Sequence, residues 1–263
     1  MQELATGYGL IEGPVWDEKR GLIYSDVING GVFCIGLDDS VSQIIEHRRG
    51  IGGMALHENG GVVVSGRNIA LKPANGADTQ VLLPNNPEGG WIGFNDITTD
   101  AKGRIYAGAL SFHPVGSDEV PKPADLFLID LDGSVRKVGG DVMLTNGLGF
   151  SPDGAKLYHS ESRRDRIRVY DVEENGDLSS HRTFAETGDV TPDGLAVAVD
   201  GSVWVAMADG GRVDVFEPDG SLRRSIKCAL PMVTSVCFGG ADLMDLYVVT
   251  GSRGTDRDDA GTV

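Results

Sequence analysis

The sequence has few of the residues that disulfide-bonded, membrane-spanning or nucleic-acid-binding proteins require. Three cysteines stand in 263 residues without a CxxC pair, and we expect them to be reduced residues on strands. The 23 Lys and Arg against 39 Asp and Glu give a net charge of −16, which argues against nucleic acid and anionic membrane surfaces as partners. No apolar run reaches the length of a membrane span, and no signal peptide is visible. We therefore expect a cytoplasmic protein, either a monomer or a homodimer.

Convincing helical periods with capping residues are missing as well. Short runs of alternating apolar residues bounded by Gly and Asp turns occur instead, for example at Leu22 and Tyr24 or at Val203 and Val205, and such runs indicate strands. Apolar residues make up 40% of the chain, which is enough for a sizeable core, and the 38 glycines fall at regular places. These features predict an all-β protein.

One unit recurs along the chain: a strand of small residues, an Asp-Gly or related turn, a strand of alternating apolar residues, a second turn and another strand. Six copies begin at residues 13, 52, 95, 146, 193 and 234. A period of roughly 40 to 50 residues is typical of propeller blades. The sequence therefore predicts a single domain over residues 1–263, an all-β six-bladed β-propeller with four-stranded antiparallel blades around a central channel.

Polar residues stand at one register of several copies, at the beginning of the first strand. They are Glu12, Asn95, Asn146 and Asp193. Because the first strand of every blade lines the channel, we expect these side chains to converge at one mouth of it. Asn-Gly and Asp-Gly are also common turn dipeptides. Turns alone, however, do not explain why acids and amides occur at the same position of several copies. Carboxylates buried together repel each other, and a divalent cation removes that cost; oxygen donors alone suit Ca²⁺, Mg²⁺ or Mn²⁺.

These residues stand within longer characteristic stretches: "EGPVWDEKRGLIYSDV", "FNDITTDAKGRIYAG", "TNGLGFSPDGAKLYHSES" and "TPDGLAVAVDGSVWVAMADGGRVDVFEPDG". With them the chain resembles the SMP-30/gluconolactonase/luciferin-regenerating family of six-bladed propellers over almost its whole length. The resemblance implies a divalent metal held by Glu12, Asn146 and Asp193, with Asn95 touching metal-bound water or the substrate. It also implies hydrolysis of the ester bond in a sugar lactone. We expect Ca²⁺, with Mg²⁺, Mn²⁺, Zn²⁺ and Fe²⁺ as alternatives.

The chemistry of such a lactonase follows from the metal. A bound cation polarises the ester carbonyl, and Asp193 can serve both as a ligand and as the catalytic base. A G-x-S-x-G motif is missing, which disfavours a serine esterase. We therefore expect a metal-dependent hydrolase of carboxylic esters with a small lactone as its partner. Two alternatives stay open: a propeller that acts as a binding or scaffold module, and a different reaction of the same metal site on a cyclic substrate.

The chain departs from the family at three places. Gly93 stands where an Arg is common, and Phe112 or a neighbour stands where a Glu helps to hold sugar hydroxyls. Both changes remove hydrogen-bonding groups, so we expect a lactone more apolar than a sugar lactone. The C-terminal stretch "SRGTDRDDAGTV" stops where relatives usually continue into one more strand, which predicts a truncated or differently closed last blade.

The remaining candidates lie near the expected mouth. We expect substrate contacts from Asn95, Asp96, Trp91, Phe112 and His113. Trp91 would form a wall of the pocket, and His113 belongs to a long insertion, residues 111–125, of the kind that often covers a site. The basic stretch 162–170 predicts salt bridges on an outer strand.

Overall fold

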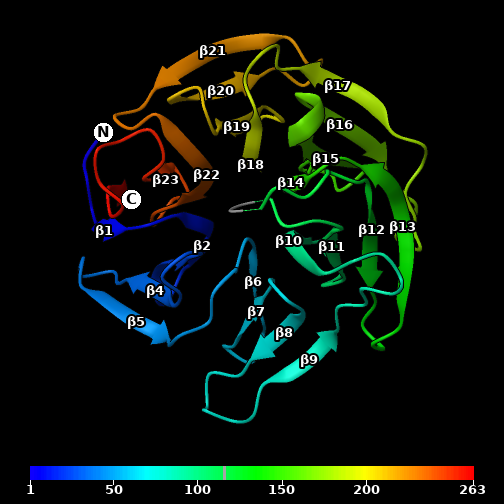
Figure 1. Ribbon diagram of the computed structural model, residues 1–263, viewed down its shortest axis with the longest axis horizontal. Helices are drawn as coiled ribbons and strands as arrows, with labels where there is room; N and C mark the ends of the chain where they lie inside the picture. The colour runs from blue at the N-terminus through cyan, green and yellow to red at the C-terminus, as the bar shows by residue number, and fades with distance from the viewer. Residues whose placement is uncertain (115–116) are drawn as a thin grey trace.

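The computed structural model describes residues 1–114 and 117–263, and its strands form blades arranged radially around a central axis (Figure 1). Apart from one 3-10 turn, η1 (Ser162–Arg164), the elements of these residues are β-strands. No helix in the described ranges is long and apolar enough to cross a membrane. The predicted all-β propeller architecture is confirmed.

Five blades are four-stranded antiparallel sheets in which neighbouring strands follow each other in sequence. The first blade consists of β2 (Ile11–Asp17), β3 (Gly21–Asp26), β4 (Val32–Ile35) and β5 (Val41–Ile45). The second consists of β6 (Met54–Leu56), β7 (Val62–Val64), β8 (Ile69–Lys72) and β9 (Gln80–Leu83). The third consists of β10 (Gly93–Thr99), β11 (Ile105–Leu110), β12 (Ala124–Ile129) and β13 (Val135–Val142).

The other two complete blades follow the same order. The fourth consists of β14 (Thr145–Phe150), β15 (Lys156–Glu161), β16 (Arg166–Asp171) and β17 (Arg182–Glu186). The fifth consists of β18 (Pro192–Val197), β19 (Val203–Met207), β20 (Arg212–Phe216) and β21 (Leu222–Lys227). In each blade the first strand is the innermost, as Figure 1 shows.

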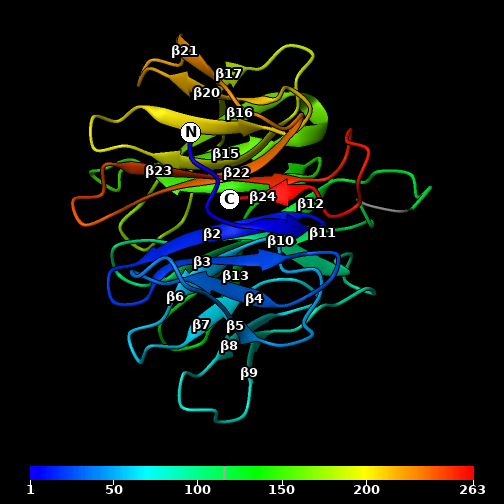
Figure 2. The same ribbon diagram turned by 90° about the vertical axis from the view of Figure 1, so that its left-hand side faces the viewer.

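The ring closes with strands from both ends of the chain. β22 (Met232–Gly239) and β23 (Asp245–Gly251) form one two-stranded sheet, and β1 (Thr6–Tyr8) pairs with β24 (Gly261–Thr262) in another. The prediction of six four-stranded blades is therefore wrong. The described part of the chain forms five four-stranded blades, because the sixth copy of the repeat supplies only two strands to its sheet. The two termini lie side by side in both views (Figures 1 and 2).

The hydrophobic core lies between neighbouring blades. Each cluster of buried side chains combines residues of adjacent sheets; Val63 and Ile69 of the second blade, for example, pack with Phe94 and Phe127 of the third. Alternating strand residues point to opposite faces of a sheet, so each blade offers an apolar face to both neighbours. This packing holds the inner strands in fixed places around the axis.

The inner strands surround a cavity of about 470 Å³ at the centre of the ring. All six of them, β2, β6, β10, β14, β18 and β22, supply residues to its wall. The wall begins directly after the polar residues singled out in the sequence: Gly13 follows Glu12, and Gly147 follows Asn146. These polar residues therefore lie at one end of the channel.

Candidate metal site at one end of the channel

The inner strands are irregular where the candidate residues stand. The pairing with the second strand shifts register after Glu12 in β2, around Asn95 in β10, around Asn146 in β14 and around Asp193 in β18. A β-bulge inserts an extra residue and re-aims side chains, and bulges are common next to active sites. The same interruption in four blades explains how residues of separate sheets reach a common point at the axis.

Glycines allow the inner strands to approach each other closely at this point. A Cβ atom at Gly147 would lie 2.4 Å from the backbone nitrogen of Leu195, and one at Gly194 would lie 2.0 Å from Ser235 Oγ. Gly147 and Gly194 directly follow Asn146 and Asp193 in the sequence. A larger residue would push apart the strands that hold the site together.

Asn95 and Asn146 are joined directly. Asn95 Nδ2 donates to Asn146 Oδ1 at 2.7 Å. Asn146 Nδ2 donates to Ser162 Oγ at 2.8 Å, and that hydroxyl donates to the Pro192 carbonyl oxygen at 2.6 Å, next to Asp193. These bonds fix the orientation of the Asn146 amide and connect the third, fourth and fifth blades at the site.

Glu12 and Asp193 are buried, and each has an oxygen without a partner. Glu12 Oε2 and Asp193 Oδ1 accept no hydrogen bond from the described residues. Burial raises the pKa of Glu12 well above its usual range, and the charges of Asp193 and Asp96 raise it further. Burial and the charge of Asp96 likewise raise the pKa of Asp193, whereas Arg253 lowers it. The two carboxylates therefore share an environment that a cation would relieve.

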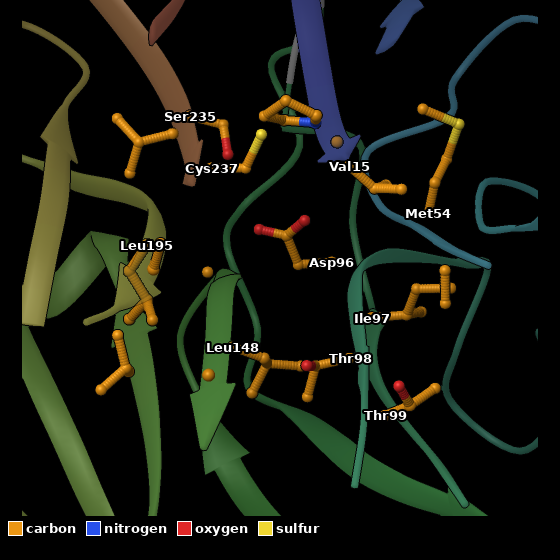
Figure 3. Close-up of a pocket in the computed structure, with 18 of the residues that line it drawn as sticks. Val15, Met54, Asp96, Ile97, Thr98, Thr99, Leu148, Leu195, Ser235 and Cys237 are labelled. Carbon is orange, nitrogen blue, oxygen red and sulfur yellow. The ribbon is translucent and has the colours of Figure 1, made fainter. Parts of the chain in front are cut away.

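Asp96 adds a third acid, one residue further along β10 than Asn95. Figure 3 shows its carboxylate projecting into the central cavity, among apolar side chains that include Val15, Leu148 and Leu195. Burial raises the pKa of Asp96 to about 7. The structure thus places Asp96 inside the channel, whereas the sequence predicted a contact with substrate at the mouth.

The donors at this end of the channel fit a hard divalent cation. In residues 1–114 and 117–263, no three His, Cys, Asp or Glu side chains form a group arranged for a metal. The candidate set consists instead of two carboxylates and an amide, Glu12, Asp193 and Asn146. Two unpartnered buried carboxylate oxygens are costly without a counter-charge, and an amide oxygen keeps a second lone pair beside one hydrogen bond. Oxygen donors of this kind suit Ca²⁺ or Mg²⁺ better than zinc.

The structure places the three predicted substrate contacts Trp91, Phe112 and His113 in different surroundings. Trp91 is half-buried and packs against Phe127, with ring centroids 4.8 Å apart. Phe112 is buried, so its ring offers little apolar surface to a ligand. His113 is exposed, and its Nδ1 lies 2.9 Å from a carboxylate oxygen of Glu119 in the same loop. Of the insertion expected to cover the site, residues 115 and 116 lie outside the described part.

A buried ion-pair cluster supports the loop that leads to Asn146. Glu161 is fully buried and accepts a hydrogen bond at 2.8 Å from the backbone N–H of Met143. Its carboxylate forms ion pairs with Arg164, Arg166 and Arg168. The predicted salt bridges of residues 162–170 are confirmed, but they centre on a buried acid at the end of β15.

Ser162 and Arg253 belong to the surroundings of the site, and the sequence did not single them out. Ser162 bonds Asn146, and Arg253 acts on Asp193 by its charge. Both stand in connections outside the repeated register, in "ESRR" and "GSRG", so the repeat gave no reason to select them.

Comparison with known proteins gives consistent matches over nearly the whole chain. Residues 10–252 match the SMP-30/Gluconolactonase/LRE-like region. A 6-deoxy-6-sulfogluconolactonase of Pseudomonas putida is 33% identical over 92% of this chain and 83% of its own. A pentonolactonase, XacC, of Haloferax volcanii is 29% identical over 93% of this chain and 82% of its own. A solved structure described as a calcium-binding protein, regucalcin, from Agrobacterium tumefaciens has a TM-score of 0.85 at 19% identity, covering 99% of this chain and 92% of that one.

Proposed function

The chain belongs to the SMP-30/gluconolactonase/LRE-like family, and we propose that it hydrolyses the ring ester of a lactone with a divalent cation held by Glu12, Asn146 and Asp193. The observation that supports this most is the pair of buried carboxylate oxygens, Glu12 Oε2 and Asp193 Oδ1, that have no partner among the described residues. Two relatives named for lactones of sugar acids support the reaction class.

The chain's own groups suit this reaction. A divalent cation supplies Lewis-acid chemistry when bound, because it polarises an ester carbonyl and makes a nearby water more acidic. Asp193 Oδ1 has no hydrogen-bond donor among the described residues, so it can accept a proton from the attacking water. The water oxygen adds to the carbonyl carbon, the ring C–O bond breaks, and the ring oxygen takes up a proton, which gives the open hydroxy acid. Asn95 and Ser162 hold the Asn146 amide in place.

The metal we propose is Ca²⁺. The donor set contains only oxygens, and the structural relative from Agrobacterium tumefaciens is described as calcium-binding. Mg²⁺, Mn²⁺, Zn²⁺ and Fe²⁺ remain alternatives that a metal add-back experiment separates. A cytoplasmic location and a monomeric or homodimeric state stay predictions.

The preference for a more apolar lactone also stays a prediction, and only one of the two residues on which it rested still supports it. Gly93 provides no side chain for sugar hydroxyls, as expected, but Phe112 is buried and does not form an apolar wall. A Cβ at Gly93 would lie 2.9 Å from the carbonyl oxygen of Gly66, so an Arg at this position would require the backbone to move.

A lactone panel with and without chelator tests the proposal. Purified protein is assayed on gluconolactone, a pentonolactone and an apolar lactone of similar size, then treated with chelator and given single metals. We expect hydrolysis of at least one lactone, a fall of about a hundredfold or more on chelation, and recovery with Ca²⁺. Full activity of the metal-free protein contradicts the metal proposal. Calcium binding without hydrolysis of any lactone favours the binding-module alternative.

A further inference from the structure

Most arginines of the chain form ion pairs with acids, and all but one of the remaining arginines lie at one end of the molecule. Ten of the sixteen arginines form ion pairs with carboxylates. In the described ranges the exceptions are Arg48, Arg49, Arg67, Arg163, Arg224 and Arg253. Arg224 lies on β21 over the ring of Trp204. The other five lie in connections at the end of the channel where the inner strands begin, which is the end that holds the candidate site.

Arg48 ties two of these connections together. Its Nη2 atom donates to the backbone carbonyls of Ser65 and Asn68, both at 3.0 Å, and to Asn68 Oδ1 at 2.8 Å. It is half-buried, and these partners are all neutral. A guanidinium has five N–H donors, so Arg48 keeps both an uncompensated charge and donors for a further partner.

Arg67 lies directly beside the predicted substrate site. A Cβ at Gly93 would lie 3.7 Å from the Cα atom of Arg67. Gly93 stands two residues before Asn95, which is at most about 7 Å along an extended strand. Arg67 and Arg49 are both exposed, and a Cβ at Gly66, next to Arg67, would lie 3.7 Å from the carbonyl oxygen of Arg49. Gly93 leaves one edge of the mouth without a side chain. Arginines border this edge: Arg67 belongs to the second blade, and Arg48 and Arg49 belong to the connection between the first and second blades.

The opposite edge of the mouth carries three acids beside the exposed Arg163. Asp165, Asp189 and Asp209 lie on connections of the fourth and fifth blades. Burial raises the pKa of Asp165, and the charges of Asp209 and Asp189 raise it further, so the three carboxylates lie close enough to interact. An anionic group at the mouth is repelled from this edge and attracted to the edge formed by Arg48, Arg49 and Arg67.

We infer that Arg48, Arg49 and Arg67 form a binding site for an anionic substituent of the lactone, a phosphate, sulfonate or carboxylate group remote from the ring ester. This inference rests on the proposed lactonase function, because it assumes that the ring ester of the lactone lies at Asn146 and Asp193. It then places the anionic substituent of the same molecule at the arginines. Arg67 makes the main contact, and Arg48 holds the loop of Arg67 in place. Arginine suits such groups because its planar fork binds two oxygens at once.

Paired substrates and paired ligands test the site. Gluconolactone and 6-phosphogluconolactone are compared as substrates, and gluconate, glucarate and 6-phosphogluconate as ligands in calorimetric titrations, with wild type, Arg67→Gln and Arg224→Gln. We expect wild type to favour the phosphorylated lactone in kcat/KM, and Arg67→Gln to reduce that preference about ten- to hundredfold, the range for a lost hydrogen bond to a charged group. Arg224→Gln, an unpaired arginine on an outer strand, should leave both substrates unaffected.

The outcomes separate the two proposals. Two results contradict the anion site and leave the lactonase function intact. One is an equal kcat/KM of wild type for gluconolactone and the phosphorylated lactone. The other is a proportional decrease of both kcat/KM values in Arg67→Gln. If no lactone is hydrolysed, the proposed function fails, and the titrations decide the anion site by themselves. Tighter binding of 6-phosphogluconate than of gluconate, lost in Arg67→Gln, then supports it; equal binding overturns it. A preference for glucarate over 6-phosphogluconate identifies a carboxylate as the preferred group.

Discussion

Asp96 differs from the residues at its position in the first, fourth and fifth blades. Gly13, Gly147 and Gly194 directly follow their candidate ligands, whereas Asn95 is followed by an acid that points into the channel. Burial is the main cause of the raised pKa of Glu12 and Asp193, and the charge of Asp96 raises both pKa values further. Without a cation, protons have to neutralise this group of acids. Metal binding at this site is therefore expected to depend on pH.

This coupling predicts how the metal-free protein responds to pH. The pKa of Asp96 is raised to about 7, whereas an unfolded Asp titrates near 3.9. Between these values the folded chain keeps a proton that the unfolded chain has released, so the free energy of unfolding falls as pH rises. We expect the melting temperature of chelated protein to decrease from pH 5 to pH 7, and Asp96→Asn to flatten this decrease.

The control for this measurement is Asp219→Asn, which changes an exposed turn far from the channel. It should leave the slope of melting temperature against pH as in wild type. An Asp96→Asn protein with the wild-type slope would show that another group is responsible.

At the scale of single elements, β15 and β16 hold the loop that presents Asn146. Glu161 at the end of β15 bonds the backbone of Met143, and Arg168 of β16 is as completely buried as Glu161. The connection from β13 to β14 has positive φ angles on both sides: Asp141, near the end of β13, has a φ of 54°, and Leu144, directly before β14, has a φ of 66°. Residues other than glycine adopt such angles at a cost, so the ion pair compensates for strain in the loop.

Loss of this ion pair should destabilise the protein strongly. Glu161→Gln leaves Arg168 as a buried charge without its carboxylate, and breaking a buried pair typically costs about 3–5 kcal/mol. We expect this loss in the free energy of unfolding from urea titration, together with weaker calcium binding because the Asn146 loop loosens. Glu217→Gln removes an exposed partner of Arg223 and should change neither quantity appreciably. Equal effects of the two substitutions would disprove the structural role of Glu161.

At the scale of the whole molecule, the repeat in the sequence predicted the arrangement of the inner strands. Because equivalent positions of a radial repeat meet at the axis, the shared register of Asn95 and Asn146 was sufficient to predict that they meet, and they are hydrogen-bonded. The count of blades was not predictable in the same way. Strands β1 and β24 pair between the two ends of the chain, and such distant pairing leaves no local pattern.

The details of the site that were not predicted have a common cause. The bulges that aim Glu12 and Asp193 interrupt the strict alternation on which strand prediction depends. Phe112 is buried, and the backbone of Arg67 in the second blade lies beside Gly93 of the third. Contacts between blades involve residues far apart in the sequence, so only the structure brings them together.

The most direct test of the central claim is a calorimetric titration of Ca²⁺ into metal-free protein. We predict one ion per chain in wild type and in the Glu217→Gln control, and no measurable binding to Glu12→Gln or Asp193→Ala, because each removes a carboxylate oxygen that has no hydrogen-bond partner among the described residues. Circular dichroism first establishes that both variants are folded. Calcium binding in these variants with the affinity and stoichiometry of wild type, or its absence from wild type, would contradict the account.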